Sequence, residues 1–309
     1  MKQDYFELKE NRDFGDIITL YFDFFKQNIK KFTDTFISYN GFFLIGILIV
    51  SYLLVSGFIG LITSTPEYST EINVVPDISY VTYLIAGFIL FFIIFIILGV
   101  LNFGLSASYM IKYVEAKGMG FDKKEVWALV KERVGSIIGF ILLLIPIYIG
   151  FFIVSFILAL IPLLGMLVQY VLQFFISAWI GVSLFAMLYE KRDVADAFGE
   201  GWKLVTNNFW KSVGVNFILG LLVGILLMLL LAIPGILIGI YSYHVVDSNL
   251  VVSESIFATI IYTLGMCIFL ILLIYSHCLT QFINGILFFN LHEKQYNTNT
   301  RAKIDQIGE

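Results

Sequence analysis

Six long apolar segments of this 309-residue chain contain none of its 42 charged residues, 19 Lys and Arg with 23 Asp and Glu. A helix needs roughly 20 apolar residues to cross the hydrocarbon core of a bilayer, and every one of the six segments is at least that long. The sequence therefore predicts an all-α membrane protein with six transmembrane helices, near residues 41–62, 81–111, 136–159, 165–189, 212–243 and 255–291.

Composition excludes a water-soluble domain, because 59% of the residues are hydrophobic and the mean hydropathy is +0.91. The second, fifth and sixth apolar segments are longer than a bilayer requires. We expect them to tilt, to bend near Pro234, or to continue as helix toward the cytoplasm beyond about Tyr275.

The basic residues predict the orientation, because short translocated loops are depleted in Lys and Arg. Residues 1–40 hold six of them, 112–135 six, 190–211 four and 292–309 three, whereas 63–80, 160–164 and 244–254 hold none. Both termini should therefore be cytoplasmic, in a multi-pass protein of a bacterial inner membrane. The outer connections carry only acidic charges, at Glu67, Glu71, Asp77, Asp247 and Glu254.

The same pattern divides the chain into three parts. Residues 1–40 form an amphipathic cytoplasmic segment, 41–291 the six-helix domain and 292–309 a polar cytoplasmic tail. Forty charged and amphipathic residues precede the first apolar segment, with no small-residue cleavage pattern, so we expect this first helix to stay as an anchor.

The chain is internally repetitive. Three times, an Asp followed three residues later by an acid precedes an amphipathic stretch that leads into a pair of apolar segments, which fits a helix N-cap with an acidic N3 residue. We expect three repeats, each an amphipathic cytoplasmic "elbow" helix followed by a transmembrane hairpin, with later elbows near 122–135 and 193–210. The acidic pairs are Asp13 with Asp16, Asp122 with Glu125, and Asp193 with Asp196.

The elbow helices have apolar residues at helical spacing, for example Ile17, Tyr21 and Phe32 in the first. Such an apolar face must be shielded from water by lipid or by protein. One alternative is a helix lying in the lipid head-group plane; the other is a helix packed under the bundle.

The third elbow also carries a specific sequence pattern. Tyr189-Glu190-Lys191 is followed by Asp196-Ala197-Phe198, then by Trp202 and by Asn208-Phe209-Trp210. This stretch resembles the membrane domain of bacterial glycerophosphodiester phosphodiesterases and its stand-alone relatives. The resemblance covers about residues 189–211 and implies a structural elbow. Because no extramembrane segment exceeds forty residues, it does not imply the soluble hydrolase domain or its activity.

Candidate chemistry is sparse. His244, His277 and His292 are scattered along the sequence, and no metal or cofactor site is expected. His277 could act within the membrane, but it lacks a carboxylate partner for a proton relay, so a hydrogen-bonded or interfacial histidine is the alternative. The pI of 5.4 gives no nucleic-acid footprint.

Polar amides form two stripes at helical spacing, one in the fourth apolar segment and one in the sixth. They can bridge helices by hydrogen bonds, or they can line a polar groove for a substrate or a lipid head group. The candidate residues are Gln169, Gln173, Ser177, His277, Gln281 and Asn284.

We expect a non-catalytic membrane component, a scaffold or accessory subunit that contacts membrane lipids and other membrane protein subunits. The alternative is a transporter or channel for a lipid, an amphiphile or a neutral solute. Ion-coupled carriers usually place charged residues within the membrane, and the apolar segments here contain none.

Overall fold

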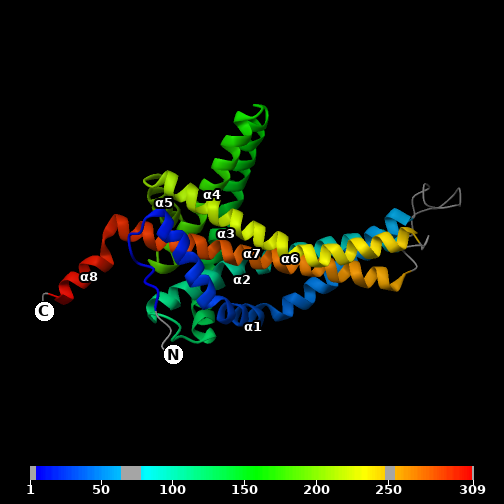
Figure 1. Cartoon of the computed structure of the whole chain (residues 1–309), viewed down its shortest axis with the longest axis horizontal. Helices are drawn as coiled ribbons and strands as arrows, with labels where there is room; N and C mark the ends of the chain where they lie inside the picture. Colours follow the sequence, from blue (N-terminus) through cyan, green and yellow to red (C-terminus); the bar gives the residue numbers. More distant parts are fainter. Residues whose placement is uncertain (1–4, 64–77, 248–254, 308–309) are drawn as a thin grey trace. The chain divides into compact units, whose positions relative to one another are not determined.

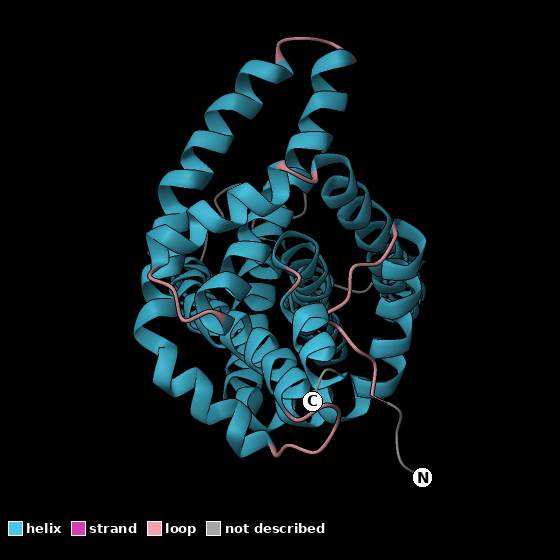
Figure 2. Ribbon diagram, turned by 90° about the vertical axis from the view of Figure 1, so that its left-hand side faces the viewer, coloured by secondary structure: helices cyan, strands magenta, loops and turns pink. Residues whose placement is uncertain are grey.

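A computed structural model describes residues 5–63, 78–247 and 255–307, and these residues form helices without any strand (Figures 1 and 2). The helices are α1 (Phe14–Thr63), α2 (Ile78–Glu115), α3 (Lys123–Ala159), α4 (Leu164–Tyr189), α5 (Val194–Thr206), α6 (Phe209–Asp247), α7 (Ile256–Tyr296) and α8 (Thr298–Ile307).

The prediction of an all-α chain with six membrane-length helices is confirmed. Six helices, α1 to α4, α6 and α7, are long and apolar enough to cross a membrane. Several are far longer than one crossing requires: α1 has 50 residues, α2 38, α6 39 and α7 41. α6 continues through Pro234 and α7 continues past Tyr275.

The three expected elbow segments do not have the same form in the structure. Residues 14–36 and 123–135 are the first turns of the long helices α1 and α3, with no break before the apolar segment. Only the third segment contains a separate helix, α5, which ends before Asn207 and Asn208. None of the three elbows contains a proline, but the third has two consecutive turn-favouring residues, Asn207 and Asn208, and α5 ends directly before them.

The chain forms two compact units. Unit 1 comprises residues 1–36, 100–223 and 277–309, and unit 2 comprises residues 37–99 and 224–276. Each of α1, α2, α6 and α7 therefore contributes one end to unit 1 and the other end to unit 2.

Unit 1 has a core of three helix segments that protein surrounds on all sides. Residues 104–111 of α2, 180–188 of α4 and 281–291 of α7 are buried without interruption. Gly285 lets α7 approach the other two, because a side chain there would meet Met110 and Phe185.

The first turns of α1 and α3, together with α5, cover this core with one face each. In α1 the buried residues recur every three or four positions, as an amphipathic helix requires. Phe24 contacts Tyr113 and Phe282 edge-on at 5.0 and 5.4 Å between ring centroids. Val130 of α3 lies against Gly104 of α2, and Gly201 of α5 lies against Ser183 of α4. The apolar faces of these segments therefore lie largely against protein.

Unit 2 consists of four helix segments that expose many large apolar side chains. Within it, Gly57 and Gly60 of α1 lie against Leu84 and Tyr80 of α2. The hydroxyls of Ser242 and Tyr262, 2.8 Å apart, join α6 to α7. The segments span residues 37–63, 78–99, 224–247 and 256–276, which is 27, 22, 24 and 21 residues.

Candidate functional site

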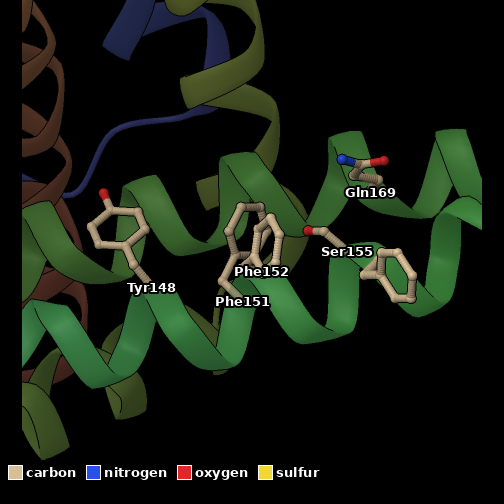
Figure 3. A pocket seen from close by; sticks show the side chains of 6 residues that line it. Tyr148, Phe151, Phe152, Ser155 and Gln169 are labelled. Atoms are coloured by element: carbon tan, nitrogen blue, oxygen red, sulfur yellow. The ribbon is translucent and has the colours of Figure 1, made fainter.

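One of the candidate polar residues lines a groove on the α3–α4 hairpin of unit 1. Gln169 of α4 faces Ser155 of α3 across this groove, and Tyr148, Phe151, Phe152 and Phe156 complete the wall (Figure 3). The groove is open and has a volume of about 520 Å³. The buried hydroxyl of Ser155 has no hydrogen-bond partner among the described residues.

Two other members of the α4 stripe lie elsewhere. The Ser177 hydroxyl donates to the side-chain oxygen Oδ1 of Asn216 in α6 at 3.1 Å, so this pair joins two helices. Gln173, one turn earlier, is exposed. The α4 stripe therefore contains one groove residue, one exposed amide and one residue that bridges helices.

The α7 stripe is mainly buried. Asn284 is 1% exposed and lies against Gly181 of α4, where a Cβ atom would come within 2.1 Å of its side-chain nitrogen. Gln281 is also buried, whereas His277 is exposed. The side-chain amide oxygens of Gln281 and Asn284 have no hydrogen-bond partner among the described residues. The six candidates therefore do not line one continuous groove.

The acidic residues of the elbow motif lie at helix starts, with different contacts. Asp122 precedes α3, and its backbone N–H donates to the Glu125 carboxylate at 2.8 Å, as in a capping box. Asp13 directly precedes α1. Asp193 precedes α5 with an extended backbone, but its side chain makes no capping hydrogen bond. Among the residues that the structure describes, only the second elbow shows a side-chain contact of this kind. Asp16 and Asp196 lie in the first turns of α1 and α5.

The aromatic residues of the third elbow are partly exposed. Trp202 is 48% exposed, and its ring lies edge-on to those of Phe175 and Trp179. Trp210 is 76% exposed. Asn208 accepts a hydrogen bond from the Lys294 ammonium at 2.7 Å, which joins the end of the elbow to α7.

A cluster of charged side chains joins the end of α4, α5 and the end of α7. Glu190 accepts hydrogen bonds from Arg192 and from His292, the latter at 2.6 Å. Arg192 also lies 3.4 Å from Glu200 of α5, whose carboxylate accepts a 2.6 Å hydrogen bond from Tyr296. We call Glu190, Arg192, Glu200, His292 and Tyr296 the α5 clamp.

Electrostatics in the α5 clamp favour the ionised form of Glu190. Burial alone would raise the pKa of this carboxyl, but the hydrogen bonds and charges of His292 and Arg192 outweigh burial and lower the pKa below its usual value. The Glu190 side chain is 14% exposed, so its charge is only partly screened by water. The arrangement fixes the end of α4, α5 and the end of α7 to one another. Among the described residues there is no group of three metal-ligating side chains.

Comparisons with known proteins give no family assignment. No family model matches the chain, and neither the curated proteins nor the solved structures contain a significant match.

The α5 clamp is the cluster that sequence reasoning did not find. Glu190 was visible as the acid that closes the fourth apolar segment, and His292 as a histidine at the end of the sixth. They are 102 positions apart in the sequence, and no local pattern links them. Their pairing depends on α4 and α7 being neighbours, which only the folded chain provides.

Proposed function

We propose that this protein is a non-catalytic component of a bacterial cytoplasmic membrane, a scaffold or accessory subunit with both termini in the cytoplasm. The proposal rests on one observation, the contacts that the polar side chains of unit 1 make. Charged and amide side chains that could serve chemistry instead bind neighbouring helices, as in the α5 clamp and the Ser177–Asn216 pair.

Two lysine side chains also join segments of the chain, because their ammonium groups donate to backbone carbonyls. Lys31 donates to the carbonyls of Met119 and Phe121, directly before the second elbow. Lys211 donates to the carbonyl of Arg12, directly before the first elbow. A lysine in each case anchors the start of another amphipathic helix, which suits a rigid body that presents surfaces to partners.

These contacts also support a repeated architecture. Lys31 and Lys211 are separated by 180 positions, and so are Asn28 and Asn208. The Asn28 amide donates to the carbonyl four residues earlier at 2.9 Å, and the Asn208 amide makes the same bond at 3.0 Å. We propose that the first and third elbows are copies of one unit, with a more divergent copy at residues 122–135.

The exposed aromatic residues support contact with lipid. Trp202 and Trp210 are exposed near Lys203 and Lys211, and amphipathic rings beside basic residues are typical of membrane interfaces. The proposed partners are therefore membrane lipids and other membrane protein subunits.

Affinity purification in mild detergent tests the scaffold proposal. We expect a stoichiometric membrane protein partner that is lost in a Glu190→Gln, His292→Leu double variant, because the α5 clamp positions the elbow surface. A matched control is Lys112→Gln, since Lys112 makes only an exposed i,i+3 ion pair with Glu115. Wild-type protein that purifies alone from its native membrane would contradict the proposal.

A second function, transport of a lipid or neutral solute, is favoured by specific observations. These are the open groove at Gln169 and the unpartnered buried oxygens of Gln281 and Asn284. Lipid-dependent thermal stabilisation that Gln169→Leu and Gln281→Leu abolish without unfolding the protein would support this alternative.

A further inference from the structure

The turn of the α3–α4 hairpin is apolar and exposed. Residues 159–164 read Ala-Leu-Ile-Pro-Leu-Leu, and Leu160, Leu163 and Leu164 are 71%, 77% and 68% exposed. Figures 1 and 2 both show this turn extending away from α5 and α8, the short helices of the same unit. An aqueous turn would normally carry polar residues, so this composition indicates a different surrounding medium.

The backbone of the turn forms most of its own hydrogen bonds. Gly165 makes this possible, since a Cβ atom there would lie 1.9 Å from the Leu158 carbonyl oxygen. Pro162 has no N–H to satisfy. In hydrocarbon every backbone polar group requires an internal partner, and this turn meets that demand for its amides over most of its length. The bonded N–H groups are those of Leu160, Ile161, Leu164, Gly165 and Leu167, at 2.7 to 3.2 Å from carbonyls between Ile157 and Leu163.

The exposed part of the hairpin is too short for a complete crossing. In α4 it runs from Leu164 to Phe175, the first large side chain of this helix that is buried, a distance of about 16 Å at 1.5 Å per residue. In α3 one face is already exposed from Val134, but the part beyond Leu144, in which no residue is buried, extends to Ala159, or about 22 Å. A hydrocarbon core is roughly 30 Å thick, so these lengths fit one leaflet and part of the second.

Polar side chains recur at one level of the hairpin. Ser155 and Gln169 each lie seven residues from Pro162, about 10 Å from the turn along their helices. Gln173 lies one turn further from Pro162 and is exposed. With the turn near the bilayer midplane, these groups approach the head-group boundary, about 15 Å from the midplane, where amides find partners.

We propose that the α3–α4 hairpin enters the membrane from the cytoplasmic side and ends within the hydrocarbon, with its turn against lipid acyl chains. Length and composition alone allow α3 and α4 to cross, but the turn has the chemistry of a buried membrane segment. The inference rests on the proposed orientation with cytoplasmic termini. It keeps that orientation, because a hairpin that enters and returns leaves the following segment on the same side.

Spin-label depth measurement tests this inference. Cys267 and Cys278 are replaced by alanine, and a nitroxide is attached through Leu163→Cys or, as a reference, Ile256→Cys. The protein is reconstituted in vesicles of phosphatidylethanolamine and phosphatidylglycerol. We expect the label at position 163 to collide with oxygen far more than with a water-soluble nickel chelate, and the label at 256 to be reached by nickel.

Either of two results would overturn the inference. Nickel access at position 163 equal to that at 256 means that the hairpin crosses the bilayer. An immobile label at 163 that neither reagent reaches means that protein covers the turn. Failure of the proposed orientation is recognised separately, because an Asn249→Cys variant would then resist labelling from outside cells whatever the depth at position 163.

A charge substitution provides an independent test without a label. Leu163 and Ile256 both lie at the start of a helix and are 77% and 73% exposed. We expect Leu163→Asp to lower abundance in the membrane about tenfold or more, because a carboxylate within hydrocarbon is costly. Ile256→Asp should leave abundance near that of wild type, and equal abundance of the two variants contradicts the inference.

Discussion

Unit 1 and unit 2 differ in charge and in the surroundings of their helices. All 19 basic residues lie in residues 1–36, 100–223 and 277–309 of unit 1, and none lies in unit 2. Unit 2 holds only five acidic residues, in its connections and at one helix end. In unit 1 the helix segments at the centre are surrounded by protein, whereas the segments of unit 2 expose apolar side chains.

This difference accounts for helices that are longer than a bilayer. The unit 2 segments have 21 to 27 residues, which fits one crossing each. The remainder of α1, α2, α6 and α7 belongs to unit 1, where protein and not lipid covers much of their surface. A long apolar segment in the sequence can therefore contain a membrane-crossing part and a protein-packed part.

The largest expected effect follows from placing the same charge in each unit. Phe92 of unit 2 and Ile304 of unit 1 are 60% and 62% exposed. Phe92→Asp should cost about 3 kcal/mol of membrane insertion, because its carboxylate enters hydrocarbon. Ile304→Asp should change stability by less than about 0.5 kcal/mol, as a surface substitution does. Membrane abundance of the two variants measures the difference, and equal losses would contradict the contrast between the units.

Removal of the Glu190 carboxylate should cost about 1.5–3 kcal/mol of unit 1 stability, because its hydrogen bonds involve charged donors. The pKa of Glu190 is lower in the folded chain, so its contribution is present above the unfolded pKa of about 4.3 and is lost as pH falls through the folded value. Thermal unfolding of wild type and Glu190→Gln in detergent, followed from pH 7 downward, checks this. The stability gap should close in acid; a constant gap would show that the charge is not responsible.

Glycine substitutions should have opposite effects on stability in the core of unit 1 and in α5, which covers that core. Gly181→Ala forces a Cβ into Asn284 and should destabilise by about 1–3 kcal/mol. Gly199→Ala in α5 meets no atom within 4 Å and should stabilise by about 0.5–1 kcal/mol through helix propensity. An unfolding midpoint that Gly181→Ala leaves unchanged or raises would mean that α4 and α7 are not packed closely at Gly181.

The smallest expected effect concerns the helix starts. Glu125→Ala removes the carboxylate that accepts from the Asp122 amide and should cost about 0.5–1 kcal/mol. Asp193→Ala should cost only a few tenths of a kcal/mol, because the Asp193 side chain makes no capping bond. A larger loss of stability in Asp193→Ala than in Glu125→Ala, measured by chemical unfolding, would show that the Asp193 side chain caps α5 after all.

The sequence was sufficient for the helices but not for their packing. Apolar length and charge exclusion predicted six membrane-length helices, because these signals are local. The amide spacing predicted two stripes, but it could not show that Ser177 joins Asn216 while Gln169 lines a groove. Those outcomes depend on which helix lies beside each face. Predicting the His292–Glu190 pair required the same knowledge of which helices are neighbours. The charge pattern also could not show that α1 continues as one helix through residues 36–41, because charges mark where an apolar segment begins and not whether the helix breaks there.

The proposed orientation is tested most directly by the side of the membrane on which the third elbow of unit 1 lies. Asn207 is exposed in unit 1, while Ser69 and Asn249 belong to the connections of unit 2. The native Cys267 and Cys278 are buried. With an impermeant maleimide on intact cells, we expect Ser69→Cys and Asn249→Cys to be labelled and Asn207→Cys to be labelled only after permeabilisation. Labelling of Asn207→Cys in intact cells would contradict the proposed orientation, with both termini in the cytoplasm.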